Sequence, residues 1–183
     1  MKGHGGIMLV RAWVFMGVFM GVFAGLAMAG PVLADPAPLT VTLADPAWTG
    51  DKIPEGQQCR KFGGKSPMTP ALKVEGLPAG TVEVLVEFND EDYYDLSFGG
   101  GHGIIGFAAG PGTAVLPAVP GETWEMPPGV RIADENRATG SYATPGYLPP
   151  CSGGNDHRYF AVVKAIDGNE EVLAEGQVTI GRF

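Results

Sequence analysis

The stretch VEVLVEF, residues 82–88, alternates apolar and charged side chains and sets the pattern for the rest of the chain. Side chains two positions apart lie on the same face of a β-strand. One face is therefore apolar and the other carries two glutamates, the apolar residues being Val82, Val84, Val86 and Phe88. This alternation predicts a strand with one face in a hydrophobic core.

Similar short apolar stretches recur along the chain, and none keeps a convincing helical period. The further strands that we expect are residues 39–43, 104–108, 113–116, 159–166 and 172–180, the last with a candidate interruption at Gly176. The 29 glycines and 16 prolines fall largely between such stretches, and Asp167-Gly168 has the composition of a hairpin turn. The longest irregular region is residues 117–156. The pattern predicts a mainly β fold, an antiparallel β-sandwich with long loops and little helix.

The first part of the chain, residues 1–34, has the order of a secretory signal peptide: a basic start, an apolar run at 12–29 and then small residues. We expect cleavage after Ala34, with Ala29 as the alternative site. An uncleaved anchor is the competing interpretation, because the apolar run approaches the length of a membrane span. Either way the chain is expected to be exported, periplasmic or secreted, with residues 35–183 forming one domain.

The charge of the expected mature chain is strongly negative. All 20 Asp and Glu residues follow residue 34, whereas two of the 12 Lys and Arg residues precede it, which leaves 20 acidic against 10 basic residues and a net charge of −10. Such a surface repels nucleic acid and anionic membranes. We therefore expect no nucleic-acid partner and no stable membrane insertion after signal cleavage.

The only two cysteines, Cys59 and Cys151, both lie in the exported part. An even count in an oxidising compartment favours a disulfide. It would close a loop of about 90 residues and stabilise the fold by about 4 kcal/mol. Zinc binding by the cysteines and histidines is the alternative, but the spacings typical of zinc sites are missing.

Three polar clusters stand at the ends of predicted strands. An acidic run contains Asp90 and Asp92, a glycine-rich loop contains His102, and His157 lies at the entry to the strand at 159–166. A carboxylate on one imidazole nitrogen orients the ring and leaves the other free for a ligand. Glycine lets backbone N–H groups approach an anion closely. Together the clusters predict a small anion pocket, although each alone is also typical of a solvated turn.

Catalytic and metal-binding motifs are not recognisable. The chain has no GxSxG sequence, and Ser152 near His157 lacks a nucleophile setting. A metal site built from the histidines and the acidic run is chemically possible, but its spacing matches no known ligand pattern. We therefore expect a protein that is not an enzyme, with no cofactor and no metal.

Several segments follow one another in a characteristic order. They are TPAL (69–72), GLPAGT (76–81), DED (90–92), His102, NRATGSYATP (136–145), PPCSGGNDHRYFAVVKAID (149–167) and VLAEGQVTIGRF (172–183). This order resembles the phosphatidylethanolamine-binding protein (PEBP) family, in its bacterial Raf-kinase-inhibitor-like (YbhB/YbcL-type) branch. Three positions depart from the family pattern: Glu91 replaces a proline, and Gly103 and Val74 replace tryptophans.

The resemblance implies an antiparallel β-sandwich of the PEBP-like type with a small pocket for phosphate-bearing or other small anionic groups. Carried over position by position, the ligand-binding residues would be Asp90, Asp92, His102, His157 and Tyr159, with Tyr142 and Pro145 on the rim. The missing tryptophan at Gly103 removes an aromatic wall beside His102.

We thus expect an exported, non-enzymatic binding protein for a small anionic or phosphorylated ligand, with His102 and His157 as hydrogen-bond donors. Protonation of either histidine is expected to tighten binding as the pH falls towards about 6. The alternative is a protein-interaction module, or a protease-inhibitor-like protein of the cell envelope, that uses the loops of residues 117–156 and has an envelope protein as its partner.

Overall fold

The computed structural model describes residues 37–183, and the predicted signal peptide with its cleavage sites lies outside them. The described part is built from β-strands and three single-turn 3₁₀ helices, η1 (Arg60–Phe62), η2 (Tyr94–Leu96) and η3 (Gly140–Tyr142). The strands are β1 (Ala37–Pro38), β2 (Thr40–Leu43), β3 (Leu72–Leu77), β4 (Glu83–Asp90), β5 (Ile104–Ala108), β6 (Gly112–Leu116), β7 (Val130–Asp134), β8 (Arg158–Ile166) and β9 (Val172–Arg182). No helix among the described residues is both long and apolar enough to cross a membrane.

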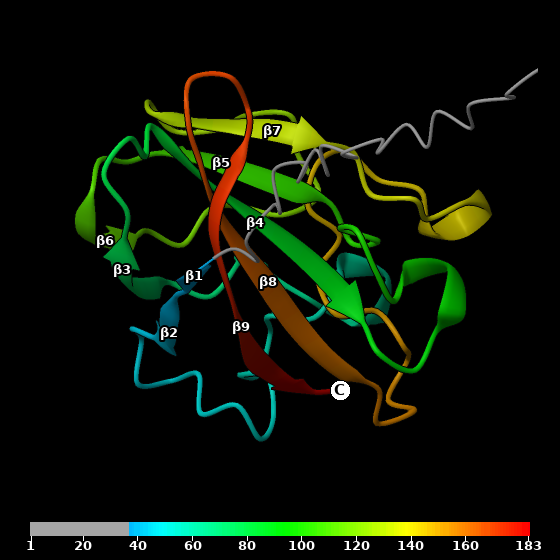
Figure 1. Cartoon of the computed structure of the whole chain (residues 1–183). Coiled ribbons are helices and arrows are strands. Elements are labelled where there is room, and N and C mark those ends of the chain that lie inside the picture. Colours follow the sequence, from blue (N-terminus) through cyan, green and yellow to red (C-terminus); the bar gives the residue numbers. More distant parts are fainter. Residues whose placement is uncertain (1–36) are drawn as a thin grey trace, which may run out of the picture. The chain divides into compact units, whose positions relative to one another are not determined.

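The strands form two sheets. The larger has the order β1-β9-β8-β4-β5-β7 and the smaller the order β2-β3-β6. Every pair is antiparallel except the short β1–β9 pair, which is parallel. Figure 1 shows β4, β8 and β9 as long neighbouring strands in the larger sheet. The predicted mainly antiparallel β-sandwich with little helix is confirmed.

The alternation in residues 82–88 produces β4 in the middle of the larger sheet. Val84, Val86 and Phe88 are buried in the main core, which also contains residues of the smaller sheet such as Leu72 and Leu116. Val82 was predicted to share this face, but it precedes the strand and is 52% exposed. The core therefore begins at Val84.

Three strands were not predicted. β1 and β3 were not recognised, the latter because its six residues lie between prolines and contain Gly76. β7 lies inside the region 117–156 that was expected to be irregular. It is an edge strand that pairs only with β5, so its sequence carries no strong alternation.

β9 runs without interruption through Gly176, contrary to the expected break. A Cβ atom at this position would lie 2.6 Å from the Leu39 carbonyl oxygen, so glycine permits the close approach of the β1–β2 segment to β9. The predicted turn between β8 and β9 spans residues 167–171, between the ends of the two strands expected from the sequence. The residue with positive φ there is Glu170 (64°), and the Asp167 carboxylate accepts hydrogen bonds from the backbone N–H groups of Asn169 and Glu171.

The predicted disulfide between Cys59 and Cys151 is present and closes a sequence separation of 92 residues. It lies in a small second hydrophobic cluster with Leu96 and Leu148. The backbone N–H of Cys59 donates to the Pro150 carbonyl, so both covalent and hydrogen bonds join these segments. This cluster forms part of the wall of the candidate site.

Candidate functional site

The three predicted polar clusters meet at one end of the larger sheet because β4 lies between β5 and β8. Asp90 is the last residue of β4 and stands opposite Tyr159 of β8. His157 immediately precedes β8. His102 lies two residues before β5, where its backbone N–H donates to the Phe88 carbonyl of β4. Antiparallel register thus brings together residues that are far apart in the sequence.

Asp90 and His157 form the central pair of the site. Nδ1 of His157 lies 2.8 Å from Oδ2 of Asp90, so the imidazole N–H donates to the carboxylate. Oδ1 of Asp90 accepts the backbone N–H of Asp92 at 3.0 Å. The Asp90 side chain is 5% exposed and that of His157 is 22% exposed. The buried carboxylate fixes the ring of a histidine whose Nε2 remains free.

His102 is fully buried and held from the opposite side. Its Nδ1 lies 2.8 Å from the Leu148 carbonyl oxygen, which only accepts hydrogen bonds, so Nδ1 carries the hydrogen. Burial lowers the pKa of the imidazole, and the Leu148 bond and the Asp90 charge oppose this only in part. Nε2 of the neutral ring is then an acceptor. It has no hydrogen-bond partner and lies 4.0 Å from Oδ2 of Asp90.

These residues line a cavity of about 600 Å³, which we call the Asp90 cavity. Four residues of the predicted site line it, namely Asp90, His102, Tyr142 and His157. Its other walls include Leu96, Phe98, Arg137 and Leu148. A volume of this size suits a small organic ligand rather than a bare ion.

Asp92, Pro145 and Tyr159 do not line the cavity. Asp92 points to the neighbouring strand, where its Oδ2 accepts the backbone N–H of Arg158 at 2.7 Å. Tyr159 lies behind the cavity: its ring stands edge-on to His102 with centroids 5.3 Å apart, and its hydroxyl accepts the backbone N–H of Cys151. Burial, followed by the negative charge of Asp90, raises the pKa of Tyr159. Tyr159 therefore supports the site from below as a neutral phenol.

Two residues of the site were not predicted from the sequence. Buried Asn89 accepts the backbone N–H groups of Gly100 and Gly101 through Oδ1, which shapes the glycine-rich loop before His102. Arg137 lines the cavity. Its guanidinium makes four hydrogen bonds to the carbonyls of Asp95, Phe98 and Gly99, leaving one of its five N–H groups unused. An Asn directly after an alternating strand and an Arg in a polar loop were the only signals available for them.

Gly103, which replaces a family tryptophan, has no room for a side chain. Its φ is 106°, and a Cβ atom would lie 2.9 Å from the Gly146 carbonyl oxygen. The aromatic groups at the mouth of the cavity come from elsewhere, and they include Tyr93, Phe98 and Tyr142, all partly exposed. Arg137 stacks over Phe98, 5.0 Å from the ring centroid. The cavity therefore keeps an aromatic rim without the missing tryptophan.

The ring of His157 is also positioned through its backbone. His157 and Phe183 exchange two backbone hydrogen bonds of 3.0 and 3.1 Å. The hydroxyl of Ser152, another cavity residue, donates to the Phe183 carbonyl. The histidine is thus fixed by its side-chain carboxylate partner and by the last residue of the chain.

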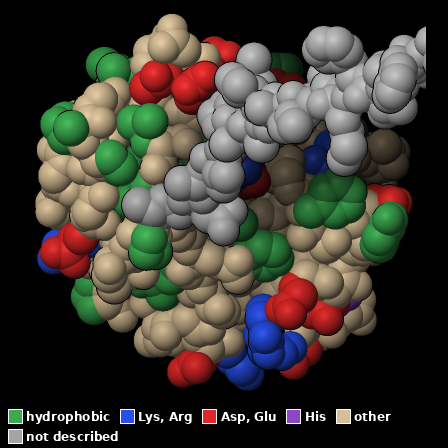
Figure 2. All heavy atoms as spheres, viewed as in Figure 1, with side chains coloured by type: hydrophobic (Ala, Val, Ile, Leu, Met, Phe, Trp, Pro, Cys, Tyr) green, Lys and Arg blue, Asp and Glu red, His purple; other side chains and the backbone are tan. Residues whose placement is uncertain are grey.

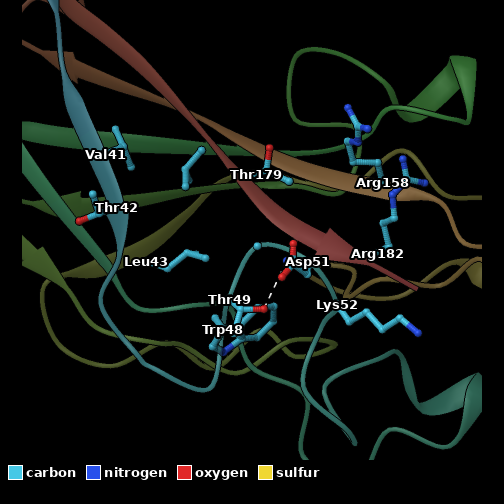
Figure 3. A pocket seen from close by; sticks show the side chains of 12 residues that line it. Val41, Thr42, Leu43, Trp48, Thr49, Asp51, Lys52, Arg158, Thr179 and Arg182 are labelled. Atoms are coloured by element: carbon cyan, nitrogen blue, oxygen red, sulfur yellow. Dashed lines mark hydrogen bonds between the residues drawn. The ribbon is translucent and has the colours of Figure 1, made fainter.

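A second hollow lies on a different surface, a groove of about 900 Å³ beside β2 and the end of β9. Figure 3 shows Lys52, Arg158 and Arg182 at one end of it and Val41 and Leu43 at the other. Arg158 and Arg182 are direct cross-strand neighbours, and Lys52 pairs with Arg182 on the other side. Arg158 therefore belongs to this outer groove and not to the Asp90 cavity.

The cations of this groove are largely balanced by exposed carboxylates. Arg158 lies 3.3 Å from Glu91, and Arg182 lies 3.4 Å from Asp156. Figure 2 shows Lys and Arg side chains gathered near the end of β9 with Asp and Glu side chains beside them. Exposed pairs of this kind contribute little energy. The buried and incompletely bonded groups are in the Asp90 cavity, which is therefore the candidate site.

Metal binding has no arrangement of ligands to support it in the described region. Across residues 37–183, no group of three or more His, Cys, Asp or Glu side chains is placed to hold an ion. Both cysteines are consumed by the disulfide.

Comparison with known proteins identifies the fold. No protein-family model matches the chain, and no curated protein matches it significantly. Among solved structures, the chain resembles Escherichia coli YbcL, described as a new member of the mammalian PEBP family, with 22% identity and a TM-score of 0.53. The alignment covers 80% of this chain and 98% of YbcL.

A PEBP homologue from Chlamydia trachomatis also matches, with 16% identity, a TM-score of 0.48, and coverage of 80% of this chain and 97% of the other. The likeness to YbcL shows that the chain has the PEBP fold. The PEBP-like fold that the resemblance predicts from the sequence is confirmed.

Proposed function

We propose that the chain is an exported, non-enzymatic binding protein whose Asp90 cavity takes a small ligand bearing a phosphate group. The observation that carries this proposal is the unpartnered, buried Nε2 atom of His102 beside a buried carboxylate at the cavity. Native proteins rarely leave a buried polar atom without a partner, and such atoms frequently mark functional sites. The cavity that Asp90, His102 and His157 line together agrees with ligand binding.

The cavity also offers donors to the oxygen atoms of an anion. Nδ1 of His157 is occupied by Asp90, so its Nε2 can donate to a ligand when the ring carries a second proton. Arg137 adds a permanent positive charge and one unused N–H group. The aromatic rim can contact an apolar body attached to the phosphate.

Export is part of the same proposal. The Cys59–Cys151 disulfide stabilises the wall of the cavity and fits an oxidising compartment. An envelope protein as a partner stays a prediction from the sequence.

The proposal is tested by NMR titration of the 15N-labelled protein with inorganic phosphate, in wild type and in His157→Ala. We expect shifts around His102 and His157 in the wild type and an affinity loss of about tenfold or more in the variant, as for one charge-assisted hydrogen bond. Lys52→Ala, which removes a cation of the outer groove, is the control and should bind normally. The absence of wild-type binding, or equal binding by wild type and His157→Ala, contradicts the proposal. Phosphorus NMR with a phosphate monoester should detect no hydrolysis.

A further inference from the structure

The two buried polar side chains that line the Asp90 cavity, Asp90 and His102, both present hydrogen-bond acceptors to each other. Oδ2 of Asp90 and Nε2 of His102 lie 4.0 Å apart. Their side chains are 5% and 3% exposed. The Leu148 carbonyl determines which nitrogen of His102 carries hydrogen, so Nε2 presents a lone pair to the carboxylate. The two atoms are too far apart for a hydrogen bond of their own and carry no hydrogen to share.

This acceptor pair constrains any anion that enters the cavity. A fully deprotonated oxygen placed against it would meet a carboxylate charge and a nitrogen lone pair in a poorly solvated environment, where repulsion is strong. An oxygen that carries a hydrogen would instead donate to Nε2 of His102 or to Oδ2 of Asp90. The donors, Arg137 and the Nε2 of a protonated His157, would remain for the other oxygens of the same group. Asp95 is a further carboxylate lining the cavity, and it is exposed rather than buried.

We propose that the Asp90 cavity selects tetrahedral oxyanions that retain a proton, such as hydrogen phosphate and the monoanion of a phosphate monoester, over sulfate and phosphodiesters. This inference rests on the proposed phosphate-binding function and narrows its ligand. Sulfate has the shape of phosphate but no proton at neutral pH. A phosphodiester, including the linkage in an intact phospholipid, has also lost its last ionisable proton. The cavity would therefore distinguish a free phosphomonoester from a lipid headgroup.

The test compares inorganic phosphate, sulfate and dimethyl phosphate by NMR titration of the full folded protein at pH about 7 and constant ionic strength. Inorganic phosphate keeps at least one proton under these conditions, whereas the other two have none. We expect phosphate to bind at least about tenfold more tightly than either, because a site built to bond a hydroxyl leaves its acceptors unpaired with an analogue that lacks one.

Two variants separate the hydrogen bond from simple charge. Asp90→Asn replaces one acceptor oxygen by an N–H donor and should reduce the preference for phosphate to less than about threefold, mainly by improving sulfate binding. Asp95→Asn removes one negative charge from an exposed part of the cavity wall and leaves the buried Asp90 carboxylate in place. This variant should keep the wild-type preference for phosphate. Thermal unfolding shows whether each variant is folded. If Asp90→Asn does not fold, the affinities of the wild-type protein for phosphate, sulfate and dimethyl phosphate decide the test.

The outcomes distinguish the two proposals. Equal binding of the three anions around His102 and His157 overturns proton selection and leaves phosphate binding in place. An equal loss of preference in both variants also overturns proton selection, since net charge would then explain it. No binding of phosphate, or shifts confined to other surfaces, overturns the proposed function itself.

Discussion

Nδ1 of His157 and Oδ2 of Asp90 lie 2.8 Å apart although 67 positions separate them in the sequence. The pairing of β4 with β8 places Asp90 opposite Tyr159, two residues beyond the histidine. The same register fixes the core residues of both strands. The central contact of the site is therefore determined by the strands that hold the fold together, and it cannot shift without disturbing the core.

Replacing Asp90 by alanine should destabilise the protein. It removes the acceptor of both the His157 imidazole and the Asp92 backbone N–H. We expect a loss of about 1–3 kcal/mol in the free energy of unfolding, measured by urea denaturation. Asp95→Ala, at an exposed position in the same cavity, should change it by less than about 0.5 kcal/mol. A loss of the same size in both variants would contradict the structural role of Asp90.

Stability should depend on pH through His102. Its pKa in the folded protein lies below the ordinary value of 6.5, so the unfolded chain takes up a proton at a higher pH than the folded one. The contribution to stability is thus complete above pH 6.5 and is lost as the pH falls from 6.5 towards the folded pKa. The slope in this window should approach about 1.4 kcal/mol per pH unit.

Comparison of wild type with His102→Asn shows whether His102 causes this dependence of the unfolding free energy on pH. The amide nitrogen of the asparagine can still donate to the Leu148 carbonyl. The charged groups that act on His102, namely Asp90, His157 and Arg137, are unchanged in this variant. Urea denaturation of both proteins between pH 5 and pH 7.5 should give a steeper loss for the wild type. Parallel curves would mean that another group is responsible.

The disulfide should contribute strongly to stability. For the separation of 92 residues between Cys59 and Cys151, the chain-entropy relation gives about 4 to 5 kcal/mol. We expect the double serine variant to unfold at a much lower urea concentration than wild type. Because Cys151 and Leu148 also line the Asp90 cavity, phosphate affinity should fall even where the variant is folded. Unchanged affinity would show that the cavity wall holds without the covalent bond.

Gly103 should tolerate no side chain. Gly103→Ala combines an unfavourable φ of 106° with a contact of 2.9 Å to the Gly146 carbonyl, and we expect a loss of at least about 2 kcal/mol. Gly112→Ala is a matched control, since its φ is 104° and nothing lies within 4 Å of the added carbon. The control should lose only about 1 kcal/mol from backbone strain. Equal losses would show that the close contact costs nothing.

Much of the larger sheet was predictable from the sequence, because the apolar residues at alternate positions of its central strands are the ones that are buried. Residues 104–108 form β5 with the expected bounds, and the ends of the strands predicted at 82–88, 113–116 and 159–166 differ from the observed ends by no more than two residues. β3 and β7 were missed for different reasons: glycine and proline hide the first, and partial exposure at a sheet edge weakens the pattern of the second. Neither difficulty affects the strands that carry the site.

The candidate site was predictable in its ionisable residues but not in its hydrogen-bond roles. The sequence brought Asp90, His102 and His157 into one hypothesis, and the structure places them around one cavity. It assigns His102 the role of an acceptor, however, rather than the predicted donor. That assignment depends on the backbone carbonyl of Leu148, 46 residues away. Every residue has such a carbonyl, so the sequence does not indicate which one contacts His102.

The backbone pair between His157 and Phe183 makes Phe183 a support of the cavity from outside its lining. Removal of this single residue would unpair His157 on its backbone side and deprive the Ser152 hydroxyl of its acceptor. A change in the backbone at position 183 therefore acts on His157 although Phe183 does not itself line the cavity.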